Sequence, residues 1–201
     1  MNFPITFEIQ GQTYHLHFIF EVLAFFIGVR YYYFLKRNHH DKISDINRLW
    51  IMLGAMIGAL LGSRIIAAFE IKDFFQHANF LEFYNNKTVL GGFLGGLFGV
   101  EGMKKVIGEK ESSGDLYVLA IILALFIGRI GCFSMGIAEQ TFGIETQFFT
   151  GMNLGDGEMR HPIMLYEMAF LAVLFVFFKK LLQKKFKNYR NGDAFIIFML
   201  L

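Results

Sequence analysis

Five of the ionisable side chains that stand inside or at the ends of long apolar stretches of this sequence are best suited to chemistry: Glu21, Arg64, Arg129, His161 and Glu167. An arginine presents a planar fork of donors that matches phosphate oxygens and stays charged at any relevant pH. The two arginines therefore suit a phosphate group. The two acids would orient the arginines, or one acid would act as a base. The other interpretation is an internal network of salt bridges that holds the protein together.

The apolar stretches that carry these residues are long enough to span a membrane. Hydrophobic residues make up 55% of the 201 residues and Phe alone occurs 26 times, far more than a soluble surface tolerates. A bilayer core of roughly 30 Å needs a helix of roughly 20 apolar residues. We therefore predict an all-α transmembrane helix bundle that forms one domain over residues 1–201. Its five full spans are expected at roughly 15–35, 49–69, 88–107, 115–133 and 162–182.

The last apolar segment is too short to cross a bilayer. As a helix, Ala194–Leu201 would measure about 12 Å, at about 1.5 Å per residue. Either this segment is peripheral, or it is an incomplete sixth span of a longer protein. The second interpretation is favoured because the segment is wholly apolar and no stop signal follows it.

Charge in the loops predicts the orientation, because loops rich in Lys and Arg stay in the cytoplasm. The first, third and fifth loops with their flanks carry four, three and six Lys or Arg residues, whereas the second carries two against two acids and the fourth carries one against four acids. We therefore expect the N-terminus to lie outside, so that segments 1–14 and 134–161 are both external. The five ionisable residues then gather in the outer half of the bilayer, near the external loop 134–161.

Residues 5–9 alternate apolar and polar side chains, and Gly11 and Gln12 follow them. This pattern is typical of a strand that ends in a turn. A short external hairpin on the membrane surface and a disordered tail are the two interpretations of this segment, and the sequence alone does not choose between them.

Two predicted spans carry a glycine at every fourth position: Gly54, Gly58 and Gly62 on one, and Gly91, Gly95 and Gly99 on the other. Small residues at this spacing let helix backbones approach closely in lipid. Tight helix packing is the main interpretation. In the alternative, the second of these spans borders a lipid substrate, and its missing side chains leave room for acyl chains.

Composition and spacing exclude several classes of function. The net charge of +2 does not suggest a nucleic acid partner, and the single cysteine, Cys132, cannot form an internal disulfide. No spacing typical of a metal site or of a nucleotide-binding glycine loop is present, so no cofactor is expected. A small transporter would carry charged groups through the full bilayer depth, or an inverted repeat, and the sequence shows neither.

Two short motifs point to a family. Residues 128–133 read Gly-Arg-Ile-Gly-Cys-Phe, and residues 160–167 read Arg-His-Pro-Ile-Met-Leu-Tyr-Glu. Both resemble the prolipoprotein diacylglyceryl transferase family, whose pattern is Gly-Arg-x-Gly-Asn-Phe and later His-Pro-x-x-Leu-Tyr-Glu. Residues 62–64 (Gly-Ser-Arg) and the glycine run at 91–96 match as well. The resemblance covers nearly the whole chain.

The resemblance implies a multi-pass enzyme of the bacterial cytoplasmic (inner) membrane, with its active site toward the outer face. The family transfers a diacylglyceryl group from phosphatidylglycerol to the thiol of the lipobox cysteine in the signal peptide of a prolipoprotein. By position, Arg129 would hold the lipid phosphate, which leaves as glycerol phosphate. His161 and Glu167 would shape or orient the catalytic site. The other expected substrate-binding residues are Arg64, Glu21, Tyr166, Gly91 and Gly95.

The chain also departs from the family pattern. Cys132 stands where the family has Asn, residues 135–137 (Met-Gly-Ile) replace Asn-Gly-Glu, and Leu90 stands where a His precedes the glycine run. His15 or His17 would substitute for the missing His. These departures favour an alternative function, that of a divergent or non-catalytic lipid-binding member that acts on another acceptor.

Overall fold

The computed structural model describes residues 3–37, 43–70, 83–84, 86–112, 114–139, 141–183 and 192–201. These residues are mostly helical and divide into two compact units. Unit 1 comprises Met1–His40 and Ser113–Leu201, and unit 2 comprises Asp41–Ser112. The described elements of unit 1 are β1 (Thr6–Ile9), β2 (Gln12–His15), α1 (Leu16–Arg37), α5 (Asp115–Met135), η1 (Gly136–Ala138), β3 (Met152–Asn153), β4 (Met159–Arg160), α6 (Ile163–Gln183) and α7 (Asp193–Leu200).

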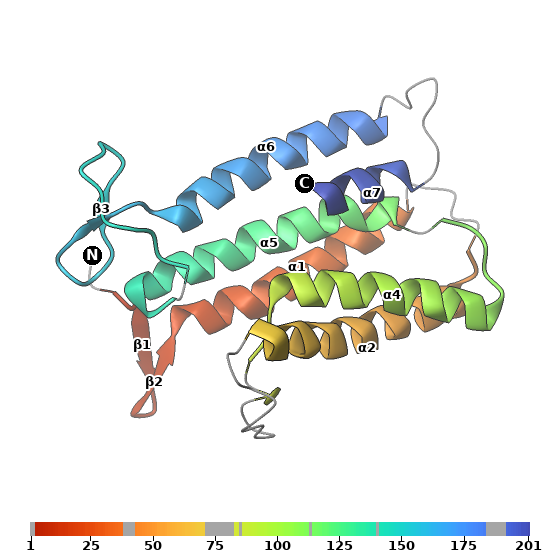
Figure 1. The fold of residues 1–201 in the computed structure, drawn as a ribbon, viewed down its shortest axis with the longest axis horizontal. Helices are drawn as coiled ribbons and strands as arrows, with labels where there is room; N and C mark the ends of the chain where they lie inside the picture. Colours follow the sequence, from red (N-terminus) through yellow and green to blue (C-terminus); the bar gives the residue numbers. More distant parts are fainter. Residues whose placement is uncertain are drawn as a thin grey trace. The chain divides into compact units, whose positions relative to one another are not determined.

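Helix α5 is the centre of unit 1, where α1, α6 and α7 all pack against it (Figure 1). Its apolar residues Val118 and Ile122 are fully buried, and they pack with Phe178 of α6 and Ala194 of α7. Helices α1 and α5 approach closely at Gly28, where a Cβ atom would lie 3.1 Å from Cβ of Ala124. This packing places the end of α5 that carries Arg129 beside the start of α6.

The short helix α7 is held in unit 1 by a side chain that is distant in sequence. Both carboxylate oxygens of Asp115 accept backbone hydrogen bonds at the start of α7, from the N–H of Gly192 at 2.8 Å and of Phe195 at 3.1 Å. The carboxylate therefore satisfies amides that a helix N-terminus leaves without intrahelical partners. The last apolar segment is thus helical, as expected, and it is docked on α5.

The N-terminal segment forms a hairpin rather than a disordered tail. Strands β1 and β2 pair antiparallel, with Thr6 opposite His15 and Ile9 opposite Gln12. The two residues between them, Gln10 and Gly11, both have positive φ angles, of 51° and 78°. A two-residue turn with positive φ at both positions matches the twist of a hairpin, and glycine adopts it without steric cost. Its placement on a membrane surface stays a prediction.

Unit 2 is an antiparallel pair of helices, α2 (Asp45–Glu70) and α4 (Val89–Ile107), in contact along their glycines. A Cβ atom on Gly54 would lie 2.6 Å from the carbonyl oxygen of Gly99, and one on Gly91 would lie 2.5 Å from that of Gly62. Real Cβ contacts are never this short, so only glycine allows the observed approach. Thr88 caps α4, because its hydroxyl accepts a hydrogen bond from the N–H of Gly91. Tight packing is therefore confirmed as a role of these glycines.

The helix lengths agree with a membrane protein. Three of the described helices, α1, α2 and α5, are long and apolar enough to cross a bilayer. Helices α4 and α6 have 19 and 21 residues, close to the roughly 20 that a span needs, and each carries three charged residues. The count of five spans and the external N-terminus stay predictions. The basic residues in 38–42 and 184–190, on which the orientation partly rests, lie outside the described residues.

Candidate functional site

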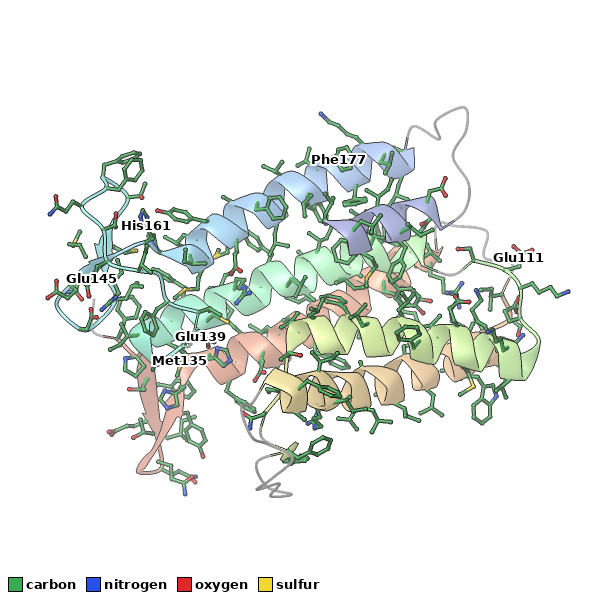
Figure 2. The ribbon with its side chains drawn as sticks, in the orientation of Figure 1. Glu111, Met135, Glu139, Glu145, His161 and Phe177 are labelled. Carbon is green, nitrogen blue, oxygen red and sulfur yellow. The ribbon has the colours of Figure 1, made fainter. Side chains whose placement is uncertain are left out.

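The candidate site of unit 1 lies where α5 ends and α6 begins. Figure 2 shows Met135, Glu139, Glu145 and His161 at this end of the unit, whereas Phe177 lies toward the other end of α6. The chain between the helices is folded onto this end. Gly136 has a φ of 60°, and the next residue, Ile137, donates a backbone hydrogen bond to the carbonyl of Leu154 at 3.1 Å. The described residues of the predicted external loop 134–161 therefore belong to the site.

Arg129 of α5 and Glu167 of α6 form a two-pronged ion pair. Nε of the arginine lies 2.7 Å from Oε2 of the glutamate, and Nη2 donates to Oε1 at 3.0 Å. The side chains are 25% and 37% exposed, so the pair is partly shielded and partly accessible. Nη1 points elsewhere and donates to Sγ of Cys132 at 3.9 Å. The glutamate thus fixes one edge of the guanidinium and leaves N–H donors for an anion.

His161 is linked to the start of α6 through Tyr166. Its Nδ1 lies 3.0 Å from the hydroxyl of Tyr166, which also forms a hydrogen bond with the hydroxyl of Thr150. The backbone N–H of His161 donates to the carbonyl of Ile144 at 3.0 Å. Gly143 packs directly on His161, where a Cβ atom would lie 2.9 Å from the Cβ of the histidine. The imidazole is therefore held by the loop on one side and by α6 on the other.

A small hairpin, β3 with β4, closes the loop around Arg160. The guanidinium of Arg160 lies 2.6 Å from Asp156 and 3.2 Å from Glu145, and it stacks over the ring of Phe142 at 5.3 Å. Asn153 stabilises the turn by accepting hydrogen bonds from the backbone of Gly155 and Gly157. Arg160 therefore positions the loop, a role that its place directly before the His-Pro motif did not reveal.

The Asp156–Arg160 pair makes the hairpin pH-dependent. The hydrogen bond from Arg160 holds the pKa of the Asp156 carboxyl below its ordinary value. The pair therefore stabilises the hairpin above the ordinary aspartate pKa, and this contribution disappears as the pH falls through the lowered pKa. In Asp156→Asn we expect the amides of 152–160 to exchange about two- to fivefold faster than in the wild type at neutral pH. The difference should vanish in acid.

Hydrogen–deuterium exchange followed by mass spectrometry measures this effect. Glu158→Gln is the matched control, because it removes one negative charge from the same hairpin but leaves the Arg160 pair intact. Equal acceleration in both variants would show that net charge, and not the ion pair, controls the hairpin.

The remaining predicted site residues belong to α1 or to unit 2. Glu21 is exposed on α1, and the acid that pairs with Arg129 is Glu167. Arg64 belongs to unit 2, where it donates to the carbonyl of Leu60 and the hydroxyl of Ser63, both at 3.1 Å. It also lies over the ring of Tyr84 at 5.1 Å. Gly91 and Gly95 belong to unit 2 as well, so the structure brings together Arg129 and Glu167 in one group, and His161 and Tyr166 in another, at the same end of unit 1.

The structure also gathers three side chains that sequence spacing did not connect. One ligand atom from each of His17, Cys132 and Glu139 lies within 4.8 Å of the other two, which is a set able to hold a metal ion. The three residues come from α1, α5 and the turn after η1. The sequence alone showed only that Cys132 departs from the family pattern and that His17 lies near the predicted outer end of its helix.

Comparison with known proteins gives the same family along almost the entire chain. The sequence model described as "Prolipoprotein diacylglyceryl transferase" matches residues 4–201. The phosphatidylglycerol–prolipoprotein diacylglyceryl transferase of Campylobacter lari is 30% identical over 222 residues, which cover 100% of this chain and 78% of the relative. The enzyme of the same name from Campylobacter curvus is also 30% identical, over 98% of this chain and 76% of the relative. That of Campylobacter hominis is 28% identical, over 98% and 74%.

These matches include both motifs that flank the loop, and the structure places the arginine of the first motif in contact with the glutamate of the second. The chain belongs to the prolipoprotein diacylglyceryl transferase family.

Proposed function

We propose that this chain transfers a diacylglyceryl group from phosphatidylglycerol to the lipobox cysteine thiol in the signal peptide of a prolipoprotein. The observation that carries the proposal is the ion pair of Arg129 with Glu167. A guanidinium held along one edge keeps its remaining N–H donors in place for a phosphate, so little ordering is needed when the lipid binds. The relatives that bear this activity in their names match the chain over nearly its whole length.

The reaction needs positive charge at the departing phosphate. The acceptor thiolate attacks the glyceryl carbon, a sulfur–carbon bond forms, and the carbon–oxygen bond to the phosphate breaks. The phosphate monoester that leaves carries more negative charge than the diester it came from. Arg129, with donors fixed before the reaction begins, stabilises this developing charge, which is the kind of interaction that lowers a barrier. Glu167 acts through Arg129 as a positioning residue.

His161 lies just before α6 in the chain, and we assign it a role in shaping the site for the acceptor. Its ring is held by Tyr166, so loss of that hydroxyl should loosen the ring without removing it. In Tyr166→Phe we expect transfer to slow by about two- to tenfold, the effect of one hydrogen bond of roughly 0.5–1.5 kcal/mol. Steady-state transfer rates measure this loss. Tyr33→Phe on α1 is the control. An equal loss of transfer in that variant would show that the effect is not specific to Tyr166.

Unit 2 carries its own candidate lipid contacts. We assign Arg64 of unit 2 a contact with a lipid headgroup, and Glu21 of unit 1 a contact with the substrate. An apolar groove of about 460 Å³ runs along α2 and α4, and Gly91 and Gly95 line it together with Leu61, Ile65, Leu94 and Phe98. A groove without polar side chains suits an acyl chain. Gly91 and Gly95 would thus serve both helix packing and lipid contact.

In the proposed membrane placement, one transmembrane domain of five full spans sits in the bacterial inner membrane with its N-terminus and active site outside. Lys110 then lies in the cytoplasm and Glu145 outside. In a Cys132→Ser background, a cysteine at position 145 should react with a membrane-impermeant thiol reagent in intact cells. A cysteine at 110 should react only after the cells are opened. The reverse pattern would overturn the orientation.

The proposed activity is tested by transfer of labelled diacylglycerol from phosphatidylglycerol to a lipobox peptide. The purified protein in detergent is compared with the Campylobacter lari relative as the positive control and with a peptide that carries Ser in place of Cys as the negative control. Label on the Cys peptide alone supports the proposal. No label, under conditions where the relative is active, would refute it.

The second candidate is a divergent family member that binds lipid or uses another acceptor. Two substitutions favour it, Cys132 for the family's Asn and Leu90 for its His. Phosphatidylglycerol binding without transfer, combined with transfer in Leu90→His, would establish this alternative. Transfer by the unaltered chain would show instead that the missing histidine is dispensable here.

A further inference from the structure

His17, Cys132 and Glu139 converge at the outer end of the α1–α5 contact. Gly131 allows the approach, because a Cβ atom there would lie 3.2 Å from the backbone oxygen of His17 and 3.3 Å from its Nδ1. Directly after this glycine comes Cys132. Glu139 follows η1, and its backbone is fixed by hydrogen bonds to Gly136 and from Phe142, both at 3.3 Å. Three different elements thus present a nitrogen, a sulfur and a carboxylate oxygen to one point.

The imidazole of His17 has a ring nitrogen that no described residue satisfies at this point. Its Nδ1 is buried and has no hydrogen-bond partner among the residues that the structure describes. A buried polar atom without a partner costs free energy, and native proteins rarely leave one unsatisfied. A ligand in the cluster would satisfy it, and the neighbouring groups, a thiol and a carboxylate, are the common partners of histidine in metal sites.

We propose that His17, Cys132 and Glu139 bind a divalent metal ion of the zinc class, and that its open fourth position takes the thiolate of the acceptor cysteine. The second half of this proposal rests on the proposed function. Three protein ligands with one open position are typical of catalytic zinc sites, whereas structural sites have four. The ligand atoms lie within 4.8 Å of one another, and tetrahedral zinc, with bonds of roughly 2.0–2.3 Å, needs separations of roughly 3.3–3.8 Å. Rotation of the three side chains would supply the contraction.

Charge at the site is compatible with a cation. Arg129 is a positive charge that would repel a metal ion here, since its Nη1 lies 3.9 Å from Sγ of Cys132. Glu167 neutralises it through the two-pronged ion pair. A thiolate and a carboxylate together balance the double charge of the metal, so the bound site is neutral overall and a third anion, the acceptor thiolate, is attracted by the remaining Lewis acidity and by Arg129.

A metal ion at this site would supply the thiolate that the reaction needs as its nucleophile. The attacking species is a thiolate, but a free cysteine is mostly a protonated thiol at neutral pH. A zinc-class ion lowers the pKa of a bound thiol so that it deprotonates, and the proton passes to solvent. The bound sulfur then forms the bond to the glyceryl carbon while the carbon–oxygen bond breaks. The phosphate leaves as glycerol phosphate, and no oxidant or reductant is needed. Such a site would compensate for the histidine that Leu90 replaces.

Metal binding is measured first, independently of activity. The full chain in detergent, freed of metal by a chelator, is titrated with Zn²⁺, and with Co²⁺ as a spectroscopic probe. We expect one Zn²⁺ per chain and a cobalt spectrum with a thiolate-to-metal band. His17→Ala, Cys132→Ser and Glu139→Gln should each weaken binding by at least about tenfold. His15→Ala and Glu145→Gln are matched controls from the same end of the unit and should bind as the wild type does.

The acceptor is tested next with a lipobox peptide added to the Co²⁺-loaded protein. The Cys peptide should intensify the thiolate-to-metal band, whereas the Ser peptide should leave it unchanged. Absence of Zn²⁺ binding, binding that survives all three variants, or an unchanged band with the Cys peptide would each overturn the proposal. Transfer activity by a protein that binds no metal would overturn this inference and leave the proposed function standing. Intact metal and thiol binding without transfer would overturn the proposed function and leave the metal site standing.

Discussion

Replacing Arg129 with alanine is expected to slow diacylglyceryl transfer by at least about 10²-fold while the protein still inserts into the membrane. Removal of one fixed donor to a developing anion costs about 10²–10³ in rate in well-studied enzymes, and this substitution removes both the charge and the donors. The measurement is the rate at which labelled diacylglycerol is transferred to a lipobox peptide. This rate is divided by the amount of monodisperse protein that detergent extracts from the membrane.

Two further variants separate the charge of Arg129 from its geometry. Arg129→Lys keeps the charge but loses the fork that holds Glu167 and a phosphate together, so an intermediate rate is expected. Glu167→Gln keeps the shape of the partner but releases the arginine from its ion pair, and the loss should again be partial. Arg30→Ala removes the same side chain from an exposed position on α1 and should have no effect. Normal transfer by Arg129→Ala would make the ion pair purely structural.

Much of the fold could be predicted because membrane helices have a simple signature. The apolar runs bounded by charge gave helix ranges that differ from the observed ones by a few residues, for example 115–133 against Asp115–Met135 and 162–182 against Ile163–Gln183. The hairpin was one of two interpretations of the alternation in residues 5–9 before Gly11, and the structure selects it over a disordered tail. The docking of α7 was not visible, because its cap comes from Asp115, which is distant in sequence.

The candidate site also has a part that the sequence predicts and a part that it does not. Arg129 and Glu167 were both predicted at the outer ends of consecutive spans, but Glu21 was an equal candidate for the acid, and the structure selects Glu167. The link from Tyr166 to His161 was hidden, because it depends on how the loop folds back onto α6. The cluster of His17, Cys132 and Glu139 was hidden for the same reason, since a metal site assembled from separate elements has no spacing pattern along the chain.

The second large effect is expected in unit 2, where Gly95→Ala should destabilise the helix pair by about 1–3 kcal/mol or more. A Cβ atom on Gly95 would overlap the carbonyl oxygen of Gly58 and lie 2.7 Å from Cα of Gly62. These are backbone atoms, which no side-chain rotation can move, so α2 and α4 must separate. The separation also removes the close packing that holds helices together in lipid, where the hydrophobic effect does not drive them into contact.

The adjacent glycine provides the control. A Cβ atom on Gly96 would meet its nearest neighbours, Ala55 and Ala59, at 3.6 Å, which is ordinary van der Waals contact. Gly96→Ala should therefore be neutral or slightly stabilising, since alanine reduces the conformational freedom of the unfolded chain. Thermal unfolding of both variants in the same detergent gives the comparison. Equal stability would mean that α2 and α4 do not pack through Gly95, and the glycines would then be better explained by room for the acyl chains of the lipid.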